Sequence, residues 1–239
     1  MIEQMNKSLD FLRDKYGFPQ GNISAGQEFF MLKDADGSTY ELLPYRIERR
    51  FSELKKMIDS NTLEDVSTLR FAKFTSGITM KKLLAEQLDL AEFIAGSPII
   101  RIFASGDGEN VCNVIARFAN SISASIECGT KLPANATVLD RHEIIARRGV
   151  GCDRGVDTQI PQHSIYLWND EGKQEYTDVD TELFGLPDEV IWNVRAACAL
   201  LKEPVLKKLW HEAASRSLKL AEAAIASARN NTPVTTGEF

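Results

Sequence analysis

The chain has 239 residues, of which 44% are hydrophobic, and a formal net charge of −6 at pH 7. This length and hydrophobic content allow one large or two small globular domains with a sizeable core, whereas the negative charge argues against general nucleic-acid binding. No apolar run approaches the roughly 20 residues that cross a bilayer, and residues 1–4 lack the cationic start of a signal peptide, so we expect a cytoplasmic protein.

The first 44 residues predict one helix and one hairpin. Apolar side chains recur at helical spacing over residues 2–16, and Gly17 ends the run. Residues 21–26 are expected to form a loop. Residues 28–33 and 38–43 are strand-like, and the Asp-Ala-Asp-Gly sequence between them favours a turn.

The following segment alternates between helices and strands. Ser52 stands where it could cap a helix, and residues 68–74 are a strand candidate. Residues 80–95 carry an apolar stripe at helical spacing that Gly96 ends. Residues 99–104 return to a strand pattern.

Residues 111–168 carry the clearest strand signal. Residues 121–128, Ser-Ile-Ser-Ala-Ser-Ile-Glu-Cys, alternate strictly between polar and apolar, which is typical of a strand with one buried face. Residues 111–118 form a β-rich run just before them, so we expect a hairpin. Residues 142–147 and 162–168 are two more strand-like runs. Together they predict one largely antiparallel sheet with an apolar face and a polar face, and the polar face would hold a site or an oligomer contact.

The rest of the chain completes the expected fold. Residues 149–159 lack periodicity and are expected to be irregular; long loops on rigid sheets often carry sites. The C-terminal third is helical: Pro187 suits a first helical turn and Pro204 breaks the pattern. The predicted class is therefore α+β, an open and mainly antiparallel sheet with helices packed on one face.

The four cysteines, Cys112, Cys128, Cys152 and Cys198, are widely spaced. They form no CxxC motif and no Cys/His cluster, so we expect no metal site. Cys112 and Cys128 fall on neighbouring predicted strands, which leaves a disulfide conceivable. The alternative is a set of buried free thiols in a reducing cytoplasm, and the wide spacing favours it.

Several motifs follow one another in a characteristic order. Arg50-Phe51 with residues 54–60 resembles "RRF…LKxxIDSG", and residues 83–98 resemble a helix that closes with Gly-x-Pro. Residues 116–127 resemble "RFxNG…SxE", residues 141–149 resemble "EIxGxxG", and residues 226–234 resemble "SAxxGxPV". In this order they resemble the C-terminal domain of the Gfo/Idh/MocA family of nicotinamide-dependent sugar oxidoreductases, over about residues 45–234. The resemblance implies a glyceraldehyde-3-phosphate dehydrogenase-like α+β domain at 45–239, whose open sheet face is the family's oligomer contact.

The sequence also departs from that family. The family begins with a dinucleotide-binding domain that carries G-x-G-x-x-G, but only 44 residues precede Tyr45 here and they contain no such motif. The family's Glu-Lys-Pro is absent too. We therefore expect residues 1–44 to be a helix and hairpin in place of the nucleotide domain. The chain would hold no cofactor of its own and would meet NAD or NADP only through a separate Rossmann-type subunit.

The resemblance also indicates candidate site residues. Glu86 takes the place of the family's acid/base histidine and could serve as a carboxylate base, although an exposed helix glutamate is the plainer interpretation. Asp89 matches a later family aspartate. Guanidinium groups suit carboxylate and phosphate, so Arg50 and Arg141, with His163, are candidates for binding an anionic sugar or a nucleotide-sugar.

Structural alternatives exist for these residues. His142 and His163 both lie in strand patterns, where filling or edging a sheet is the usual role of histidine. Arg141 and the neighbouring arginines could instead form ion pairs with Glu143 and Asp153, or with a second subunit.

Three functions remain open. The chain could be a substrate-binding or scaffold subunit of sugar or nucleotide-sugar metabolism that works beside a dinucleotide-binding partner. It could be a non-catalytic carbohydrate-binding or regulatory module. It could also be an NAD(P)-dependent sugar dehydrogenase that uses Glu86 and binds its cofactor in an unfamiliar way.

Overall fold

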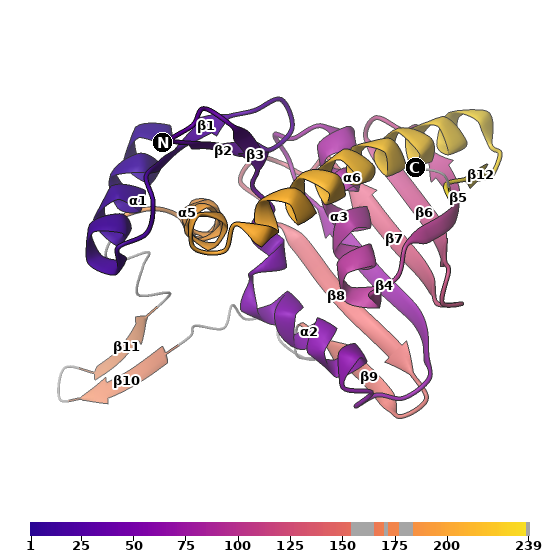
Figure 1. Cartoon of the computed structure of the whole chain (residues 1–239). Helices are drawn as coiled ribbons and strands as arrows, with labels where there is room; N and C mark the ends of the chain where they lie inside the picture. The colour runs from indigo at the N-terminus through magenta and orange to yellow at the C-terminus, as the bar shows by residue number, and fades with distance from the viewer. Residues whose placement is uncertain (154–164, 170–171, 177–183, 238–239) are drawn as a thin grey trace. The chain divides into compact units, whose positions relative to one another are not determined.

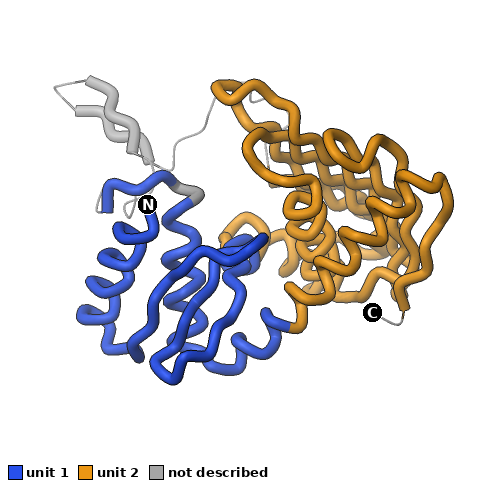
Figure 2. Tube along the Cα trace, turned by 90° about the horizontal axis from the view of Figure 1, so that it is seen from above, with its two compact units in different colours: residues 1–47, 155–211 blue, residues 48–154, 212–239 orange. Residues whose placement is uncertain are grey.

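The computed structural model describes residues 1–153, 165–169, 172–176 and 184–237 (Figure 1). The chain divides into two compact units (Figure 2), and each consists of two separate segments. Unit 1 contains residues 1–47 and 155–211, and unit 2 contains residues 48–154 and 212–239. The predicted domain boundary after residue 44 is close to the first crossing between the units. The sequence did not predict the return of 155–211 to unit 1, and the assignment of 45–239 to one domain of the family type stays a prediction.

Unit 1 contains a small antiparallel sheet and two long helices that pack on each other. Its sheet has the order β1-β2-β3, and the helices α1 and α5 contact each other and β1. The elements are α1 (Ile2–Tyr16), β1 (Gly21–Ala25), β2 (Phe30–Asp34), β3 (Thr39–Glu41), the 3-10 turn η1 (Pro44–Arg46) and α5 (Asp188–Lys202).

The sequence patterns explain most of this unit. Helix α1 ends where Gly17 takes a left-handed conformation with φ 69°, as predicted. The hairpin of β2 and β3 is also confirmed. The expected loop at 21–26 is wrong, because residues 21–25 form β1. Gly21 is needed there, since an added Cβ would lie 2.9 Å from a methyl carbon of Leu201. A strand that starts on glycine offers little sequence signal, because no side chain marks its buried face.

A separate two-stranded hairpin joins β10 (Ile165–Asn169) to β11 (Gly172–Tyr176). The prediction that residues 162–168 add a strand to the main sheet is therefore wrong for the residues that the structure describes, since β10 pairs with β11. Residues 162–164 lie outside the described part of the chain.

Unit 2 is built on a seven-stranded sheet of order β12-β5-β6-β7-β4-β8-β9. Every pairing in it is antiparallel except that of β4 with β7, so the predicted mainly antiparallel α+β fold is confirmed. Its strands are β4 (Val66–Phe74), β5 (Ile99–Gly106), β6 (Val111–Phe118), β7 (Ser123–Gly129), β8 (Leu139–Ala146), β9 (Gly149–Cys152) and β12 (Val234–Thr235).

Burial alternates along these strands and divides the sheet into two faces. In β6, the side chains of Cys112, Val114, Ala116 and Phe118 are buried and the residues between them are exposed. The buried face is covered by α2 (Arg49–Asp59), α3 (Met80–Ala95) and residues 212–230 of α6 (Val205–Asn230) (Figure 1). None of the helices in the described part of the chain lies on the opposite face, here called the open face. This matches the predicted sheet with helices on one face.

Side-chain hydrogen bonds cap α3 and attach α6 to the sheet. Thr79 caps α3 by accepting a hydrogen bond from the backbone N–H of Lys82 at 3.1 Å. Ser227 of α6 is fully buried, accepts from the backbone N–H of Ala104 and donates to the carbonyl of Thr232. These contacts join the last helix to β5.

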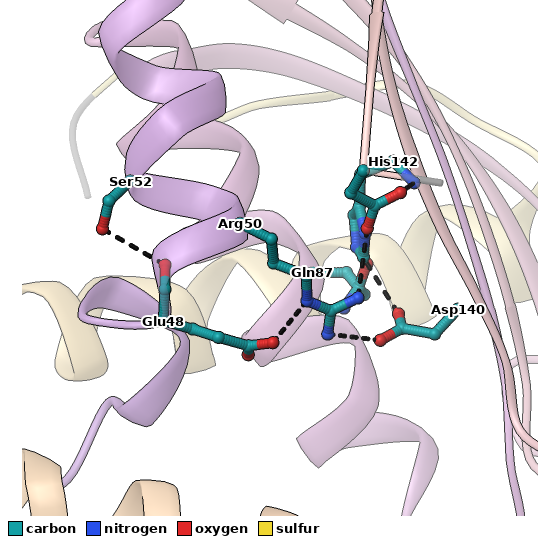
Figure 3. Close-up of polar contacts among 7 residues, drawn as sticks. Glu48, Arg50, Ser52, Gln87, Asp140 and His142 are labelled. Atoms are coloured by element: carbon teal, nitrogen blue, oxygen red, sulfur yellow. Dashed lines mark hydrogen bonds and ion pairs between the residues drawn. The ribbon is translucent and has the colours of Figure 1, made fainter. Parts of the chain in front are cut away.

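Two local predictions for unit 2 need correction. Residues 149–152, expected to be irregular, form β9 and extend the sheet beyond β8. Ser52 is not the cap of α2, because the helix begins at Arg49 after Glu48. The Ser52 hydroxyl instead donates to the Glu48 carbonyl one turn back, at 3.2 Å (Figure 3).

All four cysteines are free thiols, so the disulfide alternative is not realised. Cys112 and Cys128 lie directly opposite each other on β6 and β7, on the covered face. Among the described residues, no helix combines the length and the apolar character that crossing a membrane requires.

Candidate functional site

A cluster of charged side chains centres on Arg50, at the start of α2. The guanidinium group donates to Glu48 through Nε, to Asp140 Oδ2 through Nη2 at 2.6 Å, and to Asp153 Oδ2 through Nη1 at 3.1 Å. Figure 3 shows Arg50 between Glu48 and Asp140. One arginine thus joins the beginning of α2 to β8 and to the residue that follows β9.

His142 forms the buried end of this cluster. Its ring Nδ1 lies 2.7 Å from Asp153 Oδ2, and its backbone N–H donates to Asp153 Oδ1 at 2.9 Å. Its Nε2 lies 3.1 Å from Gln87 Oε1 on α3 and 3.6 Å from Asp140 Oδ1. The side chains of His142 and Asp153 have no exposed area. The "Arg50 cluster" below means Glu48, Arg50, Gln87, Asp140, His142 and Asp153.

Aromatic rings enclose the histidine. Phe51 and Phe71 each meet the His142 ring edge to face, with centroids 4.7 Å apart, and the Arg50 guanidinium stacks over Phe51 at 4.2 Å. The sequence interpretation of His142 as a residue that fills the sheet is therefore confirmed. A ring packed in this way cannot touch a ligand in solution.

Lys73 and Glu86 form an ion pair beside the cluster. Lys73 Nζ on β4 lies 3.6 Å from Glu86 Oε2 on α3, and Lys73 is directly opposite Asp140 on the neighbouring strand β8. The exposed fractions of the two side chains are 24% and 18%, which leaves part of each open to solvent. A ligand could therefore reach this pair, as it could reach Arg50 and Glu48, whose side chains are 30% and 20% exposed.

Burial and charge shift the pKa values of the groups in this region. Burial acts to lower the pKa of Arg50, but the carboxylates of Asp140 and Glu48 outweigh it and raise that pKa. Burial likewise opposes the charge of Lys73, whose pKa is nevertheless raised by Glu86 and Asp140. Burial acts to raise the pKa of Asp140, but Lys73 and Arg50 hold it below its ordinary value. Both cations are therefore fixed in the charged form.

Glu48 behaves differently from Asp140. Its pKa is raised because burial penalises the carboxylate more strongly than Arg50 stabilises it. Asp140 retains an acceptor, because its buried Oδ1 has no hydrogen-bond partner in the described structure. Where carboxylates and cations alternate, the carboxylates can accept hydrogen bonds from the vicinal hydroxyl groups of a polyol and the cations can donate to them.

The structure separates the residues that the sequence proposed for one site. Arg50 and Glu86 lie on the covered face of unit 2, at the Arg50 cluster and the adjoining pair. Asp89 is 1% exposed within α3. Arg141 points to the open face and pairs with Glu143, as the structural alternative supposed. His163 lies outside the described residues.

Sequence reasoning missed Lys73, Glu48, Gln87 and Asp140. One signal was available for Lys73, because the period of two places it on the same face as the buried Leu69 and Phe71. A lysine in register with core residues indicates an acidic partner. No signal of this kind identified Asp140, whose role depends on the pairing of β4 with β8.

Two patterns would indicate that the chain binds a metal ion or a dinucleotide. Among the described residues, no group of three or more His, Cys, Asp or Glu side chains is arranged to hold a metal ion. The printed sequence contains no G-x-G-x-x-G, the turn that brings a pyrophosphate to a helix N-terminus.

Comparison with known proteins relates the fold to sugar-type dehydrogenases. No protein-family model and no curated protein matches the sequence. Among solved structures, scyllo-inositol dehydrogenase from Lactobacillus casei with bound NAD(H) and scyllo-inositol is similar at a TM-score of 0.59 and 15% identity, over 82% of this chain and 64% of that one. Myo-inositol 2-dehydrogenase from Lactobacillus plantarum matches at 0.59 and 12%, over 81% and 63%. GenD2 from gentamicin A biosynthesis, in complex with NAD, matches at 0.59 and 15%, over 81% and 62%.

These similarities establish the fold. The α+β fold of this chain is similar to that of these structures, in agreement with the fold that the sequence resemblance implied. The chain spans 62–64% of the length of the three structures.

Proposed function

We propose that this chain is the polyol- or sugar-binding unit of an oxidoreductase system, with the Lys73–Glu86 pair as the ligand contact. The observation that carries the proposal is the position of Glu86. It lies on the helix where the resemblance expects an acid/base residue, within 3.6 Å of a lysine, and part of each side chain is open to solvent. The similar inositol dehydrogenases support the ligand class.

The proposed chemistry follows from the charges. Glu86 accepts hydrogen bonds from ligand hydroxyl groups, and Lys73 donates to them. Asp140 and Arg50, which stand beside the pair, orient further hydroxyls. In a complete system Glu86 would take the proton when a hydroxyl group is oxidised. A nicotinamide cofactor would then come from a separate Rossmann-type subunit, because a hydride acceptor must be held against the reacting carbon.

Binding of a set of ligands tests the first part of this proposal. Titration calorimetry with myo-inositol, scyllo-inositol, glucose and UDP-glucose is expected to show binding of at least one of them. Glu86→Gln and Lys73→Met should each weaken that binding by about tenfold, which corresponds to one lost charge-assisted hydrogen bond. Glu222→Gln is the matched control. Glu222 of α6 forms an exposed ion pair with Lys81 of α3, and neither residue belongs to the proposed site. An equal loss of ligand affinity in all three variants would show that Glu86 does not contact the ligand.

Cofactor titration tests the division between subunits. Quenching of NADH fluorescence by the chain alone is expected to be absent, and copurification with a dinucleotide-binding protein is expected. Tight NADH binding by the chain alone would instead support the sugar dehydrogenase that uses Glu86 unaided.

A non-catalytic carbohydrate-binding module is the second candidate. Glu86 pairs with Lys73, and Arg50 pairs with Asp140. Both charges are therefore already balanced within the chain, as in purely structural ion pairs, and this favours a module without catalysis. It predicts ligand binding but no turnover in any combination with NAD(P) and a partner subunit.

Two further proposals concern the oligomeric state of the protein and its location in the cell. The open sheet face would meet a second copy of the chain around β8 and β9, because exposed apolar side chains such as Leu139 and Val150, 45% and 59% exposed, favour association. The cytoplasm is the proposed location, in keeping with four free thiols. Light scattering that gives a strict monomer would contradict the first of these.

A further inference from the structure

Two arginines on the open face lie directly opposite each other. Arg101 of β5 pairs in register with Arg117 of β6, and Arg117 in turn pairs with Ser123 of β7. Both arginines are exposed, and in the described structure neither forms an ion pair. Like charges at directly opposed positions of an antiparallel pair repel each other, and this lowers stability unless an anion lies between them.

A pocket lies over this pair. It has a volume of about 390 Å³ and is lined by both arginines, Ser123, Phe103, Ile115 and Pro233. Phe103 and Ile115 are exposed by 38% and 54%, and they occupy the next outward-facing register pair of the same two strands. The pocket therefore combines a cationic end with an apolar floor. The strands that carry most of it, β5, β6 and β7, are neighbours in the sheet (Figure 1).

This site differs from the candidate sugar site. Along β5, the exposed pocket residues Arg101 and Phe103 alternate with Ile102 and Ala104, which are buried on the face that the helices cover. The arginine pair thus lies on the face opposite the Arg50 cluster. Binding here needs none of the residues of the proposed function.

We propose that the Arg101–Arg117 pocket binds a phosphate monoester attached to a planar apolar group. A phosphate monoester carries about −1.5 to −2 charges at pH 7, which balances two guanidinium groups, whereas a carboxylate balances one. Guanidinium forks bind phosphate oxygens in a bidentate way, and the Ser123 hydroxyl adds a donor in the same row. Phe103 and Ile115 offer the surface on which a planar group stacks. The volume falls in the range of about 300–1,000 Å³ that is usual for small-molecule sites.

Calorimetry at low ionic strength with three probes tests the proposal on the full chain. AMP carries both the phosphate and the planar group, adenosine lacks the phosphate, and glucose 6-phosphate lacks the planar group. AMP is expected to bind, and the other two are expected to bind at least about tenfold more weakly. Arg101→Ala and Arg117→Ala should each weaken AMP binding by about tenfold or more.

Arg70→Ala is the matched control. Arg70 is also on the open face, with a 60% exposed side chain, but it does not line the pocket. It should leave AMP binding within about twofold, because Arg70 does not line the pocket and already has a carboxylate partner in Glu143, 3.8 Å away. Since both pocket arginines are exposed and repel each other, their removal should leave the melting temperature unchanged or higher.

Three results would overturn the proposal. The first is the absence of AMP binding at millimolar concentration. The second is equal binding of AMP and adenosine, which would show that the pocket does not recognise the phosphate group. The third is a change of oligomeric state in Arg117→Glu, measured by light scattering, together with no binding of AMP to the unmodified chain. The arginine pair would then belong to a contact with a second copy.

Discussion

Asp153 contacts His142 through both carboxylate oxygens. Oδ1 accepts the backbone N–H of His142 at 2.9 Å, and Oδ2 lies 2.7 Å from the ring Nδ1 and 3.1 Å from Arg50 Nη1. One residue beyond β9 thereby fixes the position of a histidine in β8 and of an arginine in α2. Because all these contacts converge on one side chain with no exposed area, we expect Asp153 to have a large effect on the stability of unit 2.

Asp153→Asn is expected to lower the free energy of unfolding by about 3 kcal/mol, because the substitution leaves Arg50 and His142 without their shared carboxylate. Urea denaturation followed by circular dichroism measures this. Asp59→Asn is the control, since Asp59 is half exposed in an i,i+4 pair with Lys55 and should cost less than about 1 kcal/mol. Similar losses of unfolding free energy in the two variants would show that the buried contacts of Asp153 do not stabilise the fold more than a surface ion pair does.

Asp140 should make stability depend on pH in acid. Its folded pKa is held below the ordinary 3.8 by Lys73 and Arg50, although burial opposes this. The unfolded chain therefore binds the proton more readily. The stabilisation is complete above the unfolded pKa and is lost as the pH falls through the folded one.

The comparison of wild type with Asp140→Asn measures that effect. Urea denaturation between pH 7 and pH 3 should show a difference in unfolding free energy that is constant at neutral pH and shrinks below about pH 4. A difference that grows toward acid pH would show that the native state binds the proton more tightly.

Gly129→Ala should strain the end of the pairing between β7 and β4, where Gly129 lies opposite Phe74. An added Cβ would lie 2.4 Å from Phe74 Cδ1 and 2.7 Å from its Cε1, so the ring must move. A loss of about 1–3 kcal/mol is expected in chemical denaturation, as for other overpacked sites. Adding Phe74→Leu should recover much of it. Gly237→Ala, where a Cβ meets nothing within 4 Å, should be neutral.

The buried thiols should resist alkylation. Burial, with a smaller effect of Asp107, raises the pKa of Cys112 to about 11, and burial raises the pKa of Cys128 as well. Few thiolates exist at pH 8 in either case, and the thiolate is the reactive form. Iodoacetamide labelling followed by mass spectrometry should therefore modify the partly exposed Cys152 first. Labelling of Cys112 at the rate of Cys152 in the native protein would contradict the described packing.

Local patterns predicted the elements whose period is visible in the sequence. The strict alternation in residues 121–128 and the β-rich run before it became the β6–β7 hairpin, and the apolar stripe of residues 80–95 became α3. Gly17 and Gly96 ended helices as expected, since both take positive φ. The missed strands, β1 and β9, begin on glycine, where no side chain reveals which face is buried.

The sequence by itself determined the α+β class and the two faces of the sheet, because the periods of 2 and 3.6 are local properties of the chain. Only the tertiary structure decided that Lys73 lies opposite Asp140, that Arg50 reaches Asp153, and that Arg101 faces Arg117. These neighbours depend on which strands pair and in which register. That choice reflects the free energy of the whole packed sheet, which no local run of residues encodes.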